Sequence, residues 1–176
     1  MPRVAPAAVI VAVALSVAAC SSDDGPGTAV PTATASGPVA TSQQFDRAFP
    51  VAGDGWDATV TLSGLRIVPT SAFVDSVLAV DVRAVQASGQ PTLDPGDLRA
   101  FDPSGRQFER IESPGGTVPD PLVRSVMGSP GQEIRGTVAW KVPRGARIGR
   151  IDYVTSRTIG SVTVTRQPVD PSAASG

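Results

Sequence analysis

Apolar and polar side chains alternate with a period of two in several segments of the central part of the chain. On one face of the segment 134–142 the residues are apolar or small: Ile134, Gly136, Val138, Trp140 and Val142. Arg135 and Lys141 fall on the other face. Alternation of this kind is typical of a β-strand with one buried face. The segment 76–86 repeats the pattern, with Asp81 on its solvent-facing side.

A further strand is predicted over 59–67, but its alternation changes parity at Gly64. Leu62 falls on one face, whereas Leu65 and Ile67 continue on the other. A glycine inside a strand often marks a bulge or a bend. We therefore expect a β-bulge at Gly64, after which the strand crosses from one sheet to the other.

A β-hairpin is predicted where the segments 99–102 and 106–110 flank the sequence Asp-Pro-Ser-Gly at 102–105. Asp in first, Pro in second and Gly in last position suit a type I turn. Phe101 and Phe108 are the expected cross-strand partners.

A long loop at 113–120 follows and leads to a short strand or a turn at 122–127, and two more short strands are expected at 151–155 and 161–165. The region 53–166 thus holds about seven or eight short strands separated by turns, which is typical of an immunoglobulin-like fold. The sequence predicts an all-β, two-sheet sandwich.

Three motifs follow one another in this region. They are Phe-Asp-Pro-Ser-Gly-Arg-Gln-Phe at 101–108, Pro-Gly-Gln-Glu at 130–133, and the strand end Val-Pro at 142–143. Their order resembles the immunoglobulin-like domain of extracytoplasmic lipoproteins of unknown function from Gram-positive bacteria, a superfamily that includes a secreted mycobacterial antigen. The resemblance covers residues 56–155 and implies a sandwich, secretion and no established catalytic residues. Trp140 departs from the pattern, because a smaller aromatic residue would serve at this core position.

Residues 1–19 have the pattern of a secretory signal peptide, with a basic start, a short apolar stretch and small residues before the cleavage site. The segment 17–20, Val-Ala-Ala-Cys, resembles the bacterial lipobox. The resemblance implies that Cys20, the only cysteine, carries acyl chains and anchors the protein to the extracytoplasmic face of the cell membrane. Two alternatives stay open: secretion with a free Cys20, and an uncleaved anchor helix.

Residues 20–52, from the lipid-modified cysteine onward, are expected to form a disordered linker, and 167–176 a disordered tail. Both are rich in Ser, Thr, Pro, Ala and Gly and have no periodic apolar pattern. The segment 31–36 either carries O-linked sugars or is a bare linker.

The composition restricts the chemistry that the chain can perform. Histidine is absent, which excludes Ser-His-Asp and Cys-His catalysis and any zinc site that contains histidine. A Ser-Lys dyad would need Lys141, which is expected to be a solvated strand residue. The 15 basic and 16 acidic residues give no excess of positive charge, so we expect no nucleic-acid partner. We predict no catalytic residue, metal site or cofactor, although a calcium site built from oxygen ligands stays open.

Two pairs of carboxylates lie close in the sequence, Asp54 with Asp57 and Glu109 with Glu112. Paired carboxylates can hydrolyse glycosidic bonds when they are held at a suitable separation. Turn formation explains Asp54, however, and solvated charges at a strand edge explain the two glutamates. An enzyme that uses carboxylates alone is therefore the weakest of the functional hypotheses.

The candidate contacts for a partner are Trp56, Gly115 and Gly116. Trp56 is either an exposed contact or, as we favour, a cap on the core. The loop that contains the two glycines is either a recognition element or a passive connector. The leading hypothesis is a non-enzymatic interaction module of the cell envelope, bound to the membrane through Cys20 and to an envelope protein or the cell wall. The alternative is a carrier that holds an apolar or lipid ligand between its sheets.

Overall fold

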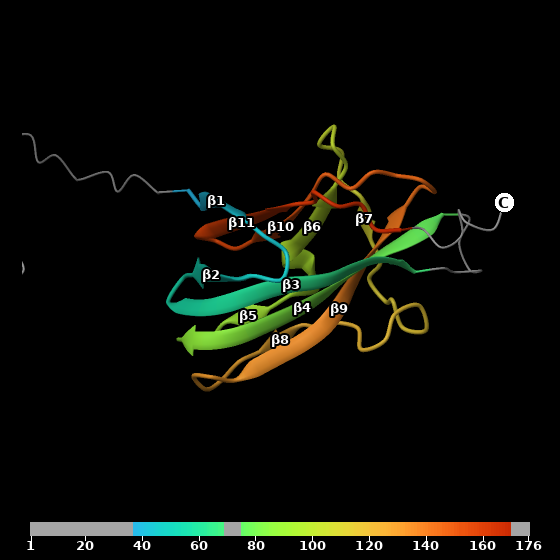
Figure 1. Cartoon of the computed structure of the whole chain (residues 1–176). Helices are drawn as coiled ribbons and strands as arrows, with labels where there is room; N and C mark the ends of the chain where they lie inside the picture. The colour runs from blue at the N-terminus through green and yellow to red at the C-terminus, as the bar shows by residue number, and fades with distance from the viewer. Residues whose placement is uncertain (1–36, 69–74, 170–176) are drawn as a thin grey trace, which may run out of the picture. The chain divides into compact units, whose positions relative to one another are not determined.

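Two β-sheets lie face to face and enclose an apolar core (Figure 1). The structure is a computed structural model that describes residues 37–68 and 75–169. The helical content of this part is a single short 3₁₀ turn, η1 (Pro95–Asp97). The prediction of an all-β, immunoglobulin-like sandwich is therefore confirmed.

The first sheet contains, in spatial order, β1 (Val39–Gln43), β11 (Thr158–Thr163), β10 (Arg150–Val154) and β6 (Leu98–Phe101). The second sheet contains β2 (Ala48–Gly53), β3 (Trp56–Val68), β4 (Ser76–Ser88), β9 (Glu133–Val142) and β7 (Glu109–Arg110). A separate two-stranded ribbon pairs β5 (Thr92–Leu93) with β8 (Ser125–Val126). The described residues thus form more strands than predicted, because several are only two residues long and two lie in the predicted linker.

The core is built from the inward-facing residues of both sheets. Strands β4 and β9 correspond to the predicted strands at 76–86 and 134–142, and their inward faces carry Leu78, Val80 and Trp140. Tyr153 enters the core from β10 in the opposite sheet. These side chains are at most 1% exposed, so the space between the sheets is filled.

The outer face of β4, predicted to face solvent, does so in only one half of the strand. Val77 and Ala79 are fully buried there, although they point away from the main core. Val118, from the loop between β7 and β8, packs with them in a second small apolar cluster. Only the half of the strand from Asp81 onward is a wet face.

The predicted bulge at Gly64 is confirmed. The pairing of β3 with β4 shifts by one residue between Ser63 and Arg66, and Gly64 has a φ of 61°. Positive φ is a conformation that glycine adopts without a steric penalty. The expected crossing between sheets is wrong, because β3 continues beside β4 on both sides of the bulge. The extra residue alone changes which side chains face inward.

The predicted turn at 102–105 is present, but the register of its hairpin differs from the prediction. Asp102 Oδ1 accepts hydrogen bonds from the amides of Ser104 and Arg106, at 2.8 and 2.9 Å. Phe101 forms a bridge with Gln107, not with Phe108. Phe108 is buried in the core. Phe101 instead lies under the Arg150 guanidinium, and the centroid of the Phe101 ring is 4.1 Å from Arg150 Cζ.

The folded part begins earlier than the predicted boundary at residue 53. Strand β1 pairs with β11 in parallel, and β2 pairs with β3. The side chains of β1 are almost all exposed, so the strand is held by its backbone and leaves no apolar pattern in the sequence. Phe49 and Val51 do alternate with exposed residues on β2, and their burial extends the core into the predicted linker.

The C-terminal boundary is also later than predicted. Gln167, placed in the tail by the sequence, forms two hydrogen bonds with the backbone of Ile148, at 2.7 and 2.8 Å. The rest of the predicted tail from residue 170 lies outside the described residues.

Trp140 is the residue by which the size of the core can be tested. Replacing it with Ala is expected to cost about 3–5 kcal/mol of unfolding free energy, because a large cavity remains. Trp140→Phe is expected to cost about 1–2 kcal/mol, since it keeps an aromatic ring and removes an indole N–H that has no hydrogen-bond partner in the described residues. Urea unfolding followed by far-ultraviolet circular dichroism measures both. Equal losses of unfolding free energy for the two variants would contradict the conclusion that the aromatic ring of Trp140 fills the core.

Candidate functional site

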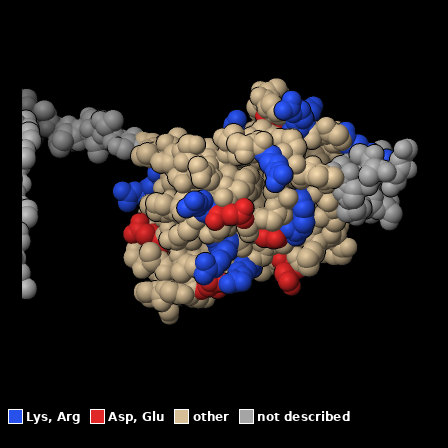
Figure 2. Space-filling model, viewed as in Figure 1, with Lys and Arg blue, Asp and Glu red and all other residues tan. Residues whose placement is uncertain are grey.

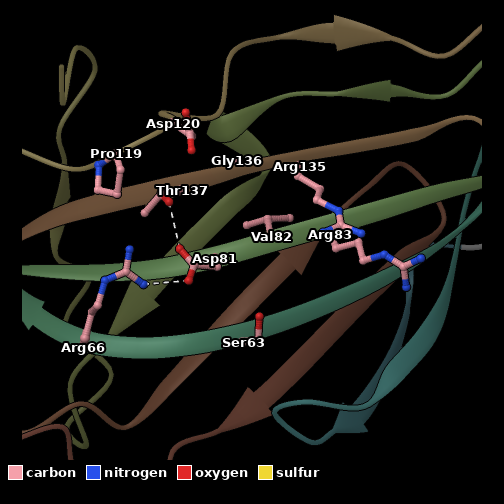
Figure 3. A pocket seen from close by; sticks show the side chains of 10 residues that line it. All are labelled: Ser63, Arg66, Asp81, Val82, Arg83, Pro119, Asp120, Arg135, Gly136 and Thr137. Atoms are coloured by element: carbon pink, nitrogen blue, oxygen red, sulfur yellow. Dashed lines mark hydrogen bonds and ion pairs between the residues drawn. The ribbon is translucent and has the colours of Figure 1, made fainter.

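A surface hollow of about 340 Å³ lies on the outer face of β3, β4 and β9 (Figure 3). Its charged lining residues come from three strands and one loop: Arg66, Asp81, Arg83, Asp120 and Arg135. Glu133 lies beside it and contacts two of these arginines. We call this set of six side chains the charged hollow.

The period of the strands explains why these residues meet. Asp81 and Arg83 are two residues apart on β4, and so share its outer face. Arg135 and Thr137 do the same on β9 and stand opposite them in the ladder. Arg66 joins this face from β3 only because the bulge at Gly64 has shifted the alternation by one residue.

Asp81 is the centre of one half of the hollow. Its Oδ2 accepts a hydrogen bond from Arg66 Nη1 at 2.8 Å, and its Oδ1 accepts one from Thr137 Oγ1 at 2.8 Å (Figure 3). A Cβ atom at Gly64 would lie 2.3 Å from Asp81 Oδ2, so the glycine also provides the space for this carboxylate. Asp81 therefore links β3 to β9 across β4.

Glu133 is the centre of the other half. Arg83 donates from Nε at 2.8 Å and from Nη2 at 2.5 Å, and the Arg135 guanidinium contacts the second carboxylate oxygen. Hydrogen bonds from Arg83 and then from Arg135 lower the pKa of Glu133 to about 2. Glu133 raises the pKa of Arg83 in turn, mainly through the hydrogen bond between them.

The loop between β7 and β8 forms one wall of the hollow. The amide of Thr137 donates to the carbonyl of Asp120 at 2.8 Å, and the amide of Leu122 donates to the carbonyl of Thr137 at 2.9 Å. A Cβ atom at Gly136 would lie 2.5 Å from the Cα of Leu122. The absence of a side chain at Gly136 thus allows the loop to bind directly to β9.

This arrangement is suited to recognition by charge. Three guanidinium groups stand beside three carboxylates, and Arg83 and Arg135 keep 49% and 71% of their side-chain surface exposed. Figure 2 shows positive and negative side chains interleaved on the visible face, rather than gathered into patches of one sign. A partner with charges in the complementary pattern would gain both attraction and a fixed orientation.

The contacts predicted from the sequence lie elsewhere. Gly115 and Gly116 are exposed in a turn of the loop between β7 and β8, and neither lines the hollow. The residues of this loop that line the hollow are Pro119 and Asp120. Trp56 is half-buried at the start of β3 and packs against the core. Its indole covers Gly53, where a Cβ atom would lie 2.2 Å from the ring, and this supports the role of a cap. Cys20 lies outside the described residues.

The carboxylates and the lysine considered for catalysis do not line the hollow. Asp57 accepts a hydrogen bond from Ser88 Oγ at 2.8 Å, and Asp54 lies in the turn between β2 and β3. Lys141 Nζ lies 3.0 Å from Glu109 Oε1 on the outer face of β9, and Glu112 is exposed in the loop. Within residues 37–68 and 75–169, no group of three or more His, Cys, Asp or Glu side chains is arranged to hold a metal ion.

Asp97 is a perturbed group that the sequence analysis missed. It lies in η1, and burial, followed by the nearby charge of Asp94, raises the pKa of its carboxyl to about 6. Burial likewise raises the pKa of the Tyr153 phenol, with smaller contributions from Asp97 and Asp94. Burial behind a 3₁₀ turn has no periodic signal, so the sequence offered no means of finding this group.

Comparison with known proteins adds to this picture at the level of the fold. The chain is similar in fold to a secreted protein from Mycobacterium tuberculosis, MPT63. The TM-score is 0.58 at 11% sequence identity, and the match covers 72% of this chain and 98% of MPT63. The yjhA protein from Bacillus subtilis matches with a TM-score of 0.44 at 12% identity, over 62% of this chain and 78% of that protein. No family model and no curated protein matches the sequence.

Replacing Asp97 with Asn is expected to raise the melting temperature at pH 7.5. The folded-state pKa of Asp97 lies above its ordinary value of 3.8, so its favourable contribution is complete below about pH 4 and is lost as the pH rises through about 6. Discounted for its partial exposure, the effect at pH 7.5 is about 1 kcal/mol, or a few degrees in Tm.

Thermal unfolding between pH 3.5 and 8 measures this effect. The Tm values of wild type and Asp97→Asn should converge near pH 4. Asp54→Asn, which changes an exposed turn residue, is the control, and its Tm difference from wild type should not depend on pH. A constant difference between wild type and Asp97→Asn at every pH would contradict the raised pKa.

Proposed function

We propose that this protein is a lipid-anchored, non-enzymatic interaction module of the bacterial cell envelope, and that its charged hollow recognises another envelope protein. The observation that carries the proposal is the interleaving of three arginines with three carboxylates on one outer sheet face. Such a surface is more specific than a patch of one sign, because a wrong partner brings like charges together.

A protein partner fits this surface better than a polyanion does. Glu133 already occupies donors of Arg83 and Arg135, and Asp81 occupies Arg66, so a chain of phosphates would meet carboxylates beside every guanidinium. A protein surface can present both signs in the required order. The nearly balanced charge of the whole chain, 15 basic against 16 acidic residues, agrees with a partner of this kind.

The anchor is proposed from the sequence of the N-terminus. Residues 1–19 read as a signal peptide, and Cys20 ends a segment that resembles the lipobox. Residues 21–38 separate Cys20 from β1, and a fully extended chain of that length reaches roughly 60 Å from the membrane surface. We also propose, on the resemblance of residues 56–155, that the domain belongs with the immunoglobulin-like lipoproteins of Gram-positive bacteria.

The interior of the sandwich argues against the carrier hypothesis. Trp140, Tyr153 and Phe49 fill the space where an apolar ligand would lie between the sheets. Ligand pockets of proteins that bind small molecules commonly enclose some hundreds of Å³ of apolar space. In the described part of the chain, apolar side chains occupy that region instead.

The anchor predicts that Cys20 is the site of acylation. In cells supplied with an alkyne-tagged fatty acid, the wild-type protein should carry the label and fractionate with membranes. Cys20→Ser should carry no label and lose its membrane association, because acyl chains on one residue supply the anchoring free energy. Mass spectrometry of the N-terminal peptide measures the modification directly. An unmodified Cys20 in the wild-type protein would refute the anchor.

The charged hollow predicts that binding depends on the order of its charges. The triple variant Arg83→Glu, Glu133→Arg, Arg135→Glu keeps the ion pairs around position 133 but inverts the sign of these three of the six charges, and it should weaken partner capture from solubilised envelopes by about tenfold or more. The matched control inverts the Lys141–Glu109 pair, which lies on the same sheet outside the hollow, and it should bind as wild type.

Each bait is compared by mass spectrometry of the molecules that co-purify, after circular dichroism has established that the variants fold. Equal capture of the partner by wild type and the triple variant would show that the hollow does not take part in partner binding. If a cell-wall fragment co-purifies in place of a protein, the proposal of a protein partner is wrong. A lipid bound to wild type and Cys20→Ser alike would favour the carrier hypothesis.

A further inference from the structure

Among the described residues, strand β1 has one free backbone edge. It is the outermost strand of the first sheet, paired in parallel with β11 from Val39 opposite Thr158 to Gln43 opposite Val162. The amide of Val39 donates to the carbonyl of Arg157 at 2.9 Å. Because successive residues of a strand direct their backbone groups to opposite sides, Ala40 and Ser42 direct theirs away from β11.

Within Val39–Gln43, this edge has none of the usual protections against pairing with another strand. Natural edge strands commonly carry charged residues, proline or a bulge that prevents association. The sequence of β1 is Val-Ala-Thr-Ser-Gln, with no charge and no proline, and its pairing with β11 shows no register shift. Val39 is 66% exposed.

The neighbouring edge of the second sheet, on β2, is closed. The amide of Ala52 donates to Thr158 Oγ1 at 3.0 Å, and the carbonyl of Ala52 accepts a hydrogen bond from the Thr155 hydroxyl. Pro50, in the middle of this strand, has no amide hydrogen to offer. Within residues 37–68 and 75–169, one of two adjacent edges is therefore blocked and the other is open.

A groove of about 430 Å³ runs between the open and the closed edge. Val39 and Thr41 line it from β1, and Pro50, Ala52 and Ala58 line it from β2 and β3. A strand added to β1 would direct every second side chain over this groove. The backbone edge and the groove together form a site for an extended strand.

We propose that the occupant is β1 of a second copy of this chain, added in antiparallel orientation about a two-fold axis. Self-pairing about such an axis places each residue near its own counterpart, so a charged strand would repel itself. β1 has no charge to repel. Pairing of Ala40 with Ser42 of the second copy uses both outward-facing residues of each strand, and it sets Thr41 opposite Thr41 of the second copy.

The resulting sheet runs continuously from β6 of one copy to β6 of the other. A strand of five residues buries less than the ~1,200 Å² of a standard interface, so we expect the association to be weak. Confinement of both copies to one surface would raise their effective concentration. The pairing itself does not depend on the anchor or on the charged hollow.

Cysteine cross-linking tests the register in intact cells. In an antiparallel pair, directly opposed residues without mutual hydrogen bonds lie at a separation that a disulfide can bridge. Full-length Thr41→Cys should give a disulfide-linked dimer on mild oxidation. Wild type, whose only cysteine is the anchor residue Cys20, and Val126→Cys, a 60% exposed residue on β8, should not. No dimer from Thr41→Cys, or equal dimer from Val126→Cys, would overturn the proposal.

Charge pairing tests the identity of the occupant. Two differently tagged wild-type copies should co-purify from the same cells, and two Thr41→Glu copies should do so at least about tenfold less. One Thr41→Glu copy with one Thr41→Lys copy should recover the association, which a misfolded variant could not do. If the mixed pair stays apart, or if Thr41→Cys cross-links to a different protein, then β1 of a second copy is not the occupant.

Discussion

The one-residue bulge at Gly64 is the constraint on which both the core and the charged hollow depend. Strand β3 is long enough to contribute to the core at both ends, and a regular strand would keep the same parity throughout. With the extra residue, Leu62 and Leu65 both face the core, and Arg66 is left on the outer face beside Asp81. A single glycine with positive φ thus determines which side chains in each half of the strand face the core.

The outer face of the second sheet is divided between two uses. Towards one end, the loop between β7 and β8 covers Val77 and Ala79 with Val118, so that part of the face is a small core of its own. Towards the other end, the same loop lines the hollow with Pro119 and Asp120 and leaves Asp81 and Arg83 partly exposed to solvent. The loop therefore has a structural role, burying apolar surface, and it also defines the wall of the hollow.

The sequence predicted most of the elements whose side chains are buried, although it missed β2 with Phe49 and Val51, and it failed where the backbone alone decides. The strands around Val80 and Trp140 and the bulge at Gly64 follow from side-chain alternation. Strand β1 leaves no such pattern, because its contribution is backbone pairing with β11. The charged hollow was missed for a different reason: each arginine reads as an ordinary solvated residue, and only the three-stranded register brings them together.

The two proposed binding sites lie on different parts of the sandwich, one on the outer face of the second sheet and one at the edge of the first sheet. Recognition by the charged hollow needs Arg83 and Arg135 exposed on the second sheet, whereas strand addition would occur at β1, in the first sheet. A dimer formed through β1 would therefore leave the hollow of each copy free. Such a dimer would present the same charge pattern twice, and would therefore gain avidity for a partner that is itself repeated or clustered.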